Sequence, residues 1–250
     1  MNTMICTYAT VHWIRFTKDQ RAEALDLSKA PMGAASWKIG PDSPLGVDGR
    51  RLPASHEWCG VALYSDRVCA ENAFDDVGAF LPFLSQAAES WHALLLPVTH
   101  RGDCNHLNKS TAGQVLAPAH SDPGGPLFVL TTAGFNVAPN MNMERVKDFR
   151  RQAARVVEWM RALDGLIAAH TFEPQTRGDD GVTMSLWKDD VSMTNFAYHP
   201  GMHRTQLDRY KAEHTADRTS FTRCRVLRSM GEWNGEDPLS LCEPSSQELR

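Results

Sequence analysis

One stretch of the chain, residues 181–233, constrains the fold more than any other. Residues 182–187 alternate apolar and polar side chains, which favours a strand with one buried face. Asp189 or Asp190 can cap the helix that follows, because a carboxylate accepts hydrogen bonds from the first free backbone N–H groups. Residues 221–230 alternate again. The stretch therefore predicts a strand–helix–strand unit.

The rest of the chain repeats this order of elements. Leu63-Tyr64-Ser65-Asp66 aligns with Leu186-Trp187-Lys188-Asp189 at a constant offset, and each half reads β-α-β-β-α-β. This order is the ferredoxin-like motif. We expect an α+β protein in which two tandem repeats form a dimeric-α+β-barrel-type fold within one chain. The other predicted strands cover residues 5–16, 36–39, 58–64, 90–98, 126–132 and 166–172, and the other predicted helices 18–30, 69–88 and 143–163.

The repeat also predicts the domain organisation. Residues 1–110 form the N-terminal repeat, and residues 126–242 form the C-terminal repeat. Between them, residues 111–125 hold several Pro and Gly residues and are expected to be a linker loop. The polar residues 243–250 are expected to be a flexible tail.

Composition excludes several classes of partner. The formal net charge is −4, so no basic surface indicates a nucleic-acid partner. No apolar run approaches the ~20 residues that a membrane helix needs. The six cysteines are scattered without a Cys-x-x-Cys pair, so no zinc-ribbon or thioredoxin-like motif is present. The N-terminus lacks the charged and apolar segments of a signal peptide. We expect a cytoplasmic protein.

Common catalytic and nucleotide-binding motifs are missing from the sequence. It contains no Gly-x-Ser-x-Gly elbow, no Gly-x-Gly-x-x-Gly turn and no Walker loop. A serine hydrolase of the α/β type, a nicotinamide enzyme and an ATPase therefore have no visible motif here.

Several segments resemble the spheroidene monooxygenase (bacterial carotenoid ketolase) family. Glu89-Ser-Trp-His-Ala-Leu-Leu-Leu-Pro-Val-Thr-His-Arg-Gly102 resembles its ESW…L.P…RG segment, and Gly231-Glu-Trp-Asn-Gly-Glu-Asp-Pro-Leu239 is similar to its GxWxGxxPL ending. Residues 185–203 resemble its SxWPD…M..FA…PH segment. The loop after Trp37-Lys-Ile-Gly40 is a weaker match, with fewer glycines than the family has.

This resemblance implies a haem-dependent monooxygenase that acts on an apolar or secondary-metabolite substrate. Haem b would be the cofactor, and it needs an axial ligand, an apolar slot and cations for its propionates. A ferredoxin-type electron-donor protein is the implied partner. A homo-oligomer is left open.

His203 is the axial ligand that the resemblance implies, because it occupies the family position relative to Phe196 and Ala197. A neutral imidazole is a common iron ligand. His199 is the competing position, since an i, i+4 pair of histidines on a helix could bind zinc. Pro200 and Gly201 argue against a regular helix between them. A surface histidine without a ligand is the third interpretation.

Five further residues are candidates for the same site. Trp91 and Trp187 could wall a flat cofactor, although buried tryptophans commonly belong to the core. Arg204 and Arg209 could pair with the propionates, although arginines on a helix are commonly solvated. Arg101 is a candidate catalytic or substrate-contacting residue at a strand end.

Three functions stay open at this point. The first is the haem monooxygenase. The second is a haem enzyme on the same scaffold with non-oxygenase chemistry, such as an aldoxime dehydratase. The third is a cofactor-free ferredoxin-like barrel that binds a small molecule. A Soret band separates the first two from the third.

Overall fold

The computed structural model confirms the α+β class and the two-repeat barrel. It describes residues 5–17, 29–43, 46, 48, 50, 56–102, 115–136, 141–172, 180–198, 205, 208–209, 213 and 215–242. The predicted helix over residues 18–30 falls almost entirely outside this part of the chain, as does the predicted tail.

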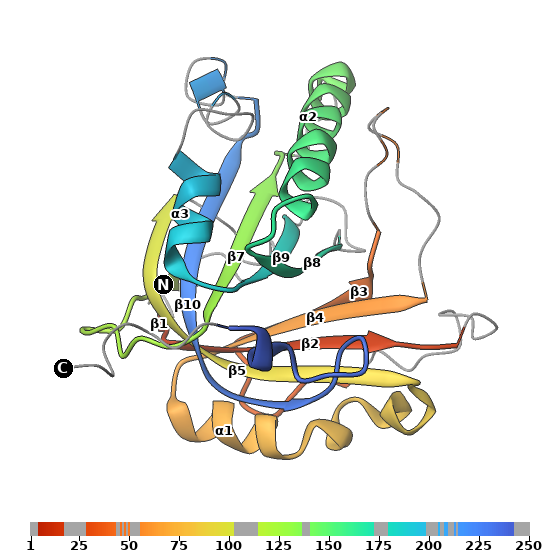
Figure 1. Ribbon diagram of the computed structural model, residues 1–250, viewed down its shortest axis with the longest axis vertical. Coiled ribbons are helices and arrows are strands. Elements are labelled where there is room, and N and C mark those ends of the chain that lie inside the picture. The colour runs from red at the N-terminus through yellow and green to blue at the C-terminus, as the bar shows by residue number, and fades with distance from the viewer. Residues whose placement is uncertain are drawn as a thin grey trace.

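Eight strands form one antiparallel sheet in the order β3-β4-β2-β5-β10-β7-β9-β8. When the strands of each half are numbered one to four in chain order, they lie in the sheet in the order 4-1-3-2, which is the ferredoxin-like order. The two fourth strands, β5 and β10, pair with each other and join the halves (Figure 1). The strands are β2 Tyr8–Arg15, β3 Ser36–Pro41, β4 Glu57–Tyr64, β5 Glu89–Gly102, β7 Leu127–Gly134, β8 Leu166–Phe172, β9 Gly181–Trp187 and β10 Arg218–Gly231.

Two of the predicted segments need correction. Helix α1 is Arg67–Asp75, with Asp66 as its N-cap, and two 3-10 turns, Val77–Ala79 and Pro82–Gln86, replace the rest of the helix predicted up to residue 88. Pro82 has no N–H for an α-helical hydrogen bond, which explains why the helix cannot continue through it. The region predicted as a linker loop contains a short strand, β6 Val115–Leu116, which pairs in parallel with β1 Ile5–Cys6.

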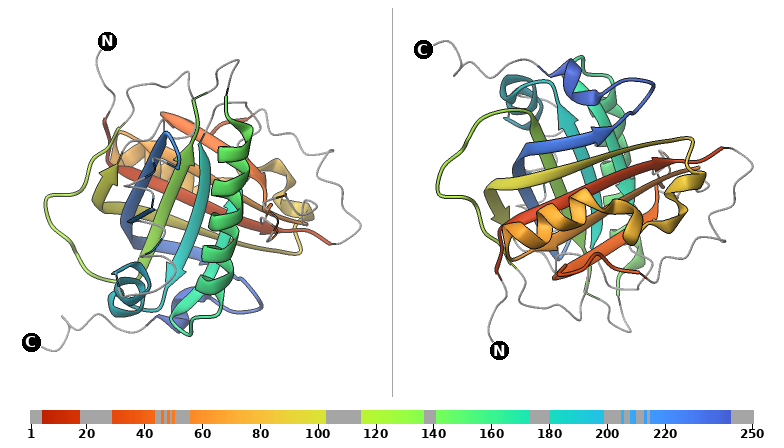
Figure 2. Two further views of the ribbon diagram at one scale, coloured as in Figure 1. Left: turned by 90° about the horizontal axis from the view of Figure 1, so that it is seen from above. Right: turned by 90° about the horizontal axis from the view of Figure 1, so that it is seen from below.

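The sheet curls until its two edges meet (Figure 2). At this seam the Ser43 backbone N–H donates to the Thr171 carbonyl oxygen over 2.9 Å. The inner face forms one apolar core, because alternate residues of every strand point inward. Its larger members are Trp13, Leu63, Trp91, Leu95, Phe128, Phe172, Met184, Leu186 and Trp233.

Helices cover the outer face of both halves. Helix α1 packs on the N-terminal half, whereas α2 Met143–Arg161 and α3 Asp190–Tyr198 pack on the C-terminal half (Figures 1 and 2). No helix in the described part of the chain is both long and apolar enough to cross a membrane. The proposed domain boundaries stay predictions.

Candidate functional site

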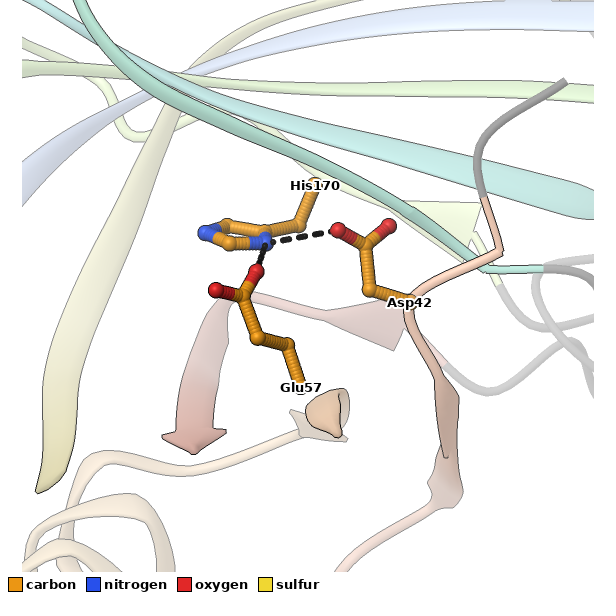
Figure 3. A group of neighbouring side chains, drawn as sticks. All are labelled: Asp42, Glu57 and His170. Carbon is orange, nitrogen blue, oxygen red and sulfur yellow. Dashed lines mark hydrogen bonds and ion pairs between the residues drawn. The ribbon is translucent and has the colours of Figure 1, made fainter. Parts of the chain in front are cut away.

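Three polar side chains meet inside the barrel at the seam between its halves. His170 lies on β8, Glu57 begins β4 and Asp42 follows β3. The His170 Nδ1 lies 3.1 Å from Asp42 Oδ2 and 3.7 Å from Glu57 Oε2 (Figure 3). The side chains of His170 and Asp42 are each 5% exposed, and that of Glu57 is 22% exposed. These groups are therefore held largely out of water.

Strand alternation and register explain why these residues converge. On β8, Ala169 faces the helices whereas Phe172 lies in the inner core, so His170 points inward with Phe172. Glu57 shares the inner face of β4 with Cys59. The Asp42 N–H donates to the Glu57 carbonyl oxygen over 2.8 Å, which continues the β3–β4 ladder by one residue and brings the two carboxylates to one level of the barrel.

Each carboxylate is fixed by one oxygen and presents the other oxygen to the imidazole. Asp42 Oδ1 accepts the backbone N–H of Thr171 at 2.9 Å. Glu57 Oε1 accepts the Nε–H of Arg15 at 2.9 Å. Asp42 Oδ2 and Glu57 Oε2 therefore face the His170 Nδ1, and each carboxylate is held in place by a group other than the imidazole.

Arg15 ties the site to the turn that closes this end of the barrel. Its guanidinium also donates to Glu89 and, at 2.9 Å, to Asn234 Oδ1, and its Cζ lies 4.2 Å from the centroid of a Trp233 ring. Gly235 donates its backbone N–H to Glu89 over 2.6 Å. The turn after β10 is thereby fixed to β2 and β5 from two sides.

Aromatic rings pack around the imidazole. The Trp13 and Trp233 rings lie 4.7 and 5.0 Å from the His170 ring, and Trp91 lies 4.5 Å from Trp13. Within the described residues, His170 Nε2, Trp13 Nε1 and Trp91 Nε1 are buried and have no hydrogen-bond partner. Buried polar atoms without a partner are rare in proteins, and three of the five in the described structure lie at this site.

The donor types at this site allow two kinds of chemistry. An imidazole oriented by a carboxylate can move a proton through its free nitrogen, and an imidazole with two carboxylates can bind a metal ion. Burial, together with the charges of Asp42 and Glu57, raises the pKa of the nearby Cys59 thiol well above its usual value. A thiolate is therefore not among the groups at this site.

Trp187 and Arg209 lie on the helix-covered side of the C-terminal half. Trp187 is buried, donates its Nε1–H to Ser185 Oγ over 2.9 Å, and packs 5.2 Å from the Phe196 ring of α3. Arg209 donates to Asp148 of α2 over 2.9 Å and to Glu213 over 2.8 Å. These two predicted residues therefore share one side of the sheet.

Two other predicted residues, Trp91 and Arg101, lie elsewhere. Trp91 is fully buried in the inner core, on the opposite face of the sheet from Trp187, so the two tryptophans do not wall one space. Arg101 is exposed near the end of β5, opposite Phe221 of β10. His203 and Arg204 lie outside the described residues.

The sequence did not reveal Asp42, Glu57 and His170 as a site. Alternation places two of them on the inner face of their strands, and this was the one available signal. Their convergence requires the closure of the barrel between β3 and β8, which no local pattern encodes.

A pair of histidines lies on the outer face of the N-terminal half. The Nδ1 atoms of His12 and His92 lie 3.0 Å apart, His12 Nε2 lies 2.9 Å from Thr10 Oγ1, and His92 Nε2 lies 3.2 Å from Ser90 Oγ. Burial lowers the pKa of His92 to about 4 and, with the nearby charge of His92, lowers the pKa of His12 well below its usual value. Both imidazoles are therefore neutral near pH 7.

Comparisons with known proteins identify a shared fold but no family to which the chain can be assigned. No protein-family model matches the chain, and no curated protein matches it significantly. An aldoxime dehydratase solved in complex with butyraldoxime is 11% identical, with a TM-score of 0.54 over 94% of this chain and 84% of that one. A protein described provisionally as a monooxygenase, from Fusobacterium nucleatum, is 13% identical, with a TM-score of 0.39 over 93% and 97%. The first of these likenesses shows a shared barrel fold.

Proposed function

We propose that the chain is an oxidoreductase of the monooxygenase type that acts on a small apolar molecule, with haem b bound on the helix-covered side of its C-terminal half. Enzymatic activity is proposed because an aldoxime dehydratase shares the fold over 94% of this chain and 84% of its own. Haem is proposed because of the resemblance to the ketolase family. A ferredoxin-type protein is the proposed electron donor, because dioxygen activation at haem consumes electrons.

The packing of Trp187 on Phe196 carries the proposal. Both residues belong to the segment that resembles the ketolase pattern, and they come from β9 and α3 respectively. Their rings lie 5.2 Å apart, and Trp159 of α2 lies 5.2 Å from Phe196 on the same side. The segment therefore forms a packed aromatic unit in the layer between the sheet and the helices, away from the barrel interior.

The residues on this side fit haem in part. The Trp187, Phe196 and Trp159 rings offer an apolar wall, and Arg209 offers a cation that would exchange Asp148 for a propionate. His203 is the residue proposed to bind the haem iron. Bound haem would supply the iron chemistry that activates dioxygen. The aromatic residues would exclude water and orient an apolar substrate.

Haemin titration of the purified full-length protein tests this proposal. We expect a Soret band that saturates at about one haem per chain. The band should be lost in His203→Ala and retained in His199→Ala, which serves as the matched control. A protein that gives no Soret shift with haemin, or keeps its full shift in His203→Ala, would refute the proposed haem site.

Aldoxime dehydration is the second candidate, favoured by the fold match over 94% of the chain. In that reaction the substrate loses water and becomes a nitrile, without net oxidation and without consumption of dioxygen. Anaerobic incubation of the haem-loaded, reduced protein with butyraldoxime would yield butyronitrile if this function holds. Dioxygen uptake that requires a reductant and an apolar substrate would instead support the monooxygenase.

A further inference from the structure

We infer that Asp42, Glu57 and His170 bind one divalent first-row transition-metal ion inside the barrel. This site lies on the inner face of the sheet, whereas Trp187 and Arg209 lie on the outer face. The inference therefore goes beyond the proposed haem enzyme and does not depend on it.

The spacing of the donor atoms suits a single ion. The ligand atoms of the three residues lie within 4.8 Å of one another, and the His170 Nδ1 is 3.1 and 3.7 Å from the two carboxylate oxygens (Figure 3). Ligands bound at roughly 2.1 Å with tetrahedral or octahedral angles lie about 3.0–3.4 Å apart. The two distances from Nδ1 are close to this range, and ligand atoms as far as 4.8 Å apart would need to approach each other by up to about 1.4 Å to bind one ion.

The carboxylates are oriented as metal ligands usually are. In metal sites, groups outside the ligand set hold each ligand in place through its other polar atom. Here the backbone N–H of Thr171 holds Asp42 Oδ1, and Arg15 holds Glu57 Oε1. Asp42 Oδ2 and Glu57 Oε2 are thereby directed at the same nitrogen. A single proton on Nδ1 can bond well to only one of these oxygens, whereas a cation can attract both.

The unpartnered Nε2 of His170 is a second, independent observation. The side chain is 5% exposed, and Nε2 is buried among aromatic rings without a hydrogen-bond partner in the described structure. If Nδ1 donates a proton to Asp42, then Nε2 carries a buried lone pair that accepts nothing. If Nδ1 binds a metal, the ring proton moves to Nε2, and an N–H is the form that the electron-rich ring faces tolerate.

The donor set selects the kind of metal. One imidazole nitrogen and two carboxylate oxygens suit Mn²⁺, Fe²⁺, Co²⁺ or Zn²⁺, whereas Mg²⁺ and Ca²⁺ prefer oxygen ligands alone. No cysteine is among the ligand atoms of this group. The site therefore matches a first-row divalent ion with water completing its coordination.

Cobalt titration of the chelator-treated full-length protein tests this inference. We expect visible d–d absorption that saturates at about one Co²⁺ per chain and is displaced by Zn²⁺ but not by Mg²⁺. Affinity should fall on the order of 100-fold in Glu57→Gln and in Asp42→Asn, since each loses an anionic ligand but keeps its anchoring oxygen. His203→Ala should bind Co²⁺ as the wild type does, which separates this site from the proposed haem ligand.

Glu89→Gln is the matched control, because Glu89 also accepts from Arg15 but is not among the ligand atoms. It should retain wild-type affinity for Co²⁺. Near-UV circular dichroism checks that every variant folds, and Glu57→Gln keeps the test decisive if the more buried Asp42→Asn does not fold. Absence of Co²⁺ uptake in the wild type, or equal loss in Glu57→Gln and Glu89→Gln, would overturn the inference.

Discussion

Acidification should destabilise the protein through the buried histidine pair. His12 and His92 share one short contact between their Nδ1 atoms, which requires one nitrogen to donate and the other to accept. Protonation of the ring whose Nδ1 accepts places two donors against each other, and protonation of the other ring places a charge in a buried space. The pKa of His92 is about 4 in the folded state, compared with 6.5 for an unperturbed histidine, and the pKa of His12 is also lowered.

The size of the effect follows from these pKa values. Between the unfolded and folded pKa, the unfolded chain binds more protons, so stability is complete above the unfolded pKa and falls as the pH decreases towards the folded one. Each pH unit corresponds to about 1.4 kcal/mol per proton. Between pH 8 and pH 5, His92 therefore removes about 2 kcal/mol from the free energy of unfolding, and His12, whose pKa is also lowered, acts in the same direction.

Urea unfolding of the wild type and of His92→Gln at several pH values measures this effect. The wild type should lose about 2 kcal/mol more than the variant between pH 8 and pH 5, because the variant retains only one of the two buried histidines. Most carboxylates remain ionised at pH 5, so they contribute little over this range. An equal loss in both proteins would contradict the assignment to the pair.

Four substitutions test the fold itself. Gly102→Ala should lower the free energy of unfolding by more than about 2 kcal/mol, because φ is +92° and a Cβ would lie 2.1 Å from the Thr219 carbonyl oxygen; a neutral result would contradict this strain. Asp66→Ala and Asp189→Ala should each cost about 1 kcal/mol, as loss of an N-cap does, and unchanged urea midpoints would argue against these caps. Arg225→Met should cost on the order of 2 kcal/mol by thermal or urea unfolding, because two carboxylates lose a largely buried partner, and wild-type stability would contradict that role.

The local patterns predicted most of the fold. The alternation in residues 182–187 and 221–230 became β9 and β10, and the alignment of Asp66 with Asp189 became two N-caps that accept from Cys69 and Ser192. These features depend on neighbours in sequence, which is why the sequence reveals them. The helix predicted up to residue 88 ends at Asp75. The apolar residues after it lie in 3-10 turns and pack on the same core, so their pattern alone did not reveal the end of the helix.

The candidate site was less accessible to sequence reasoning. Trp91 and Trp187 are both buried aromatic residues near strand ends. They differ in the face of the sheet on which they lie, which the sequence alone does not reveal. Conversely, His170 comes from the second half of the chain, whereas Asp42 and Glu57 come from the first. Their contact depends on the closure of the barrel, a long-range event that leaves no periodic signal.

The most direct test of the proposed function is the amount of haem that the protein retains. After reconstitution with haemin and removal of the excess by gel filtration, the proposal predicts about one haem per chain in the wild type and in His199→Ala, and almost none in His203→Ala. A wild-type protein that elutes without haem, or three proteins with equal haem content, would contradict it.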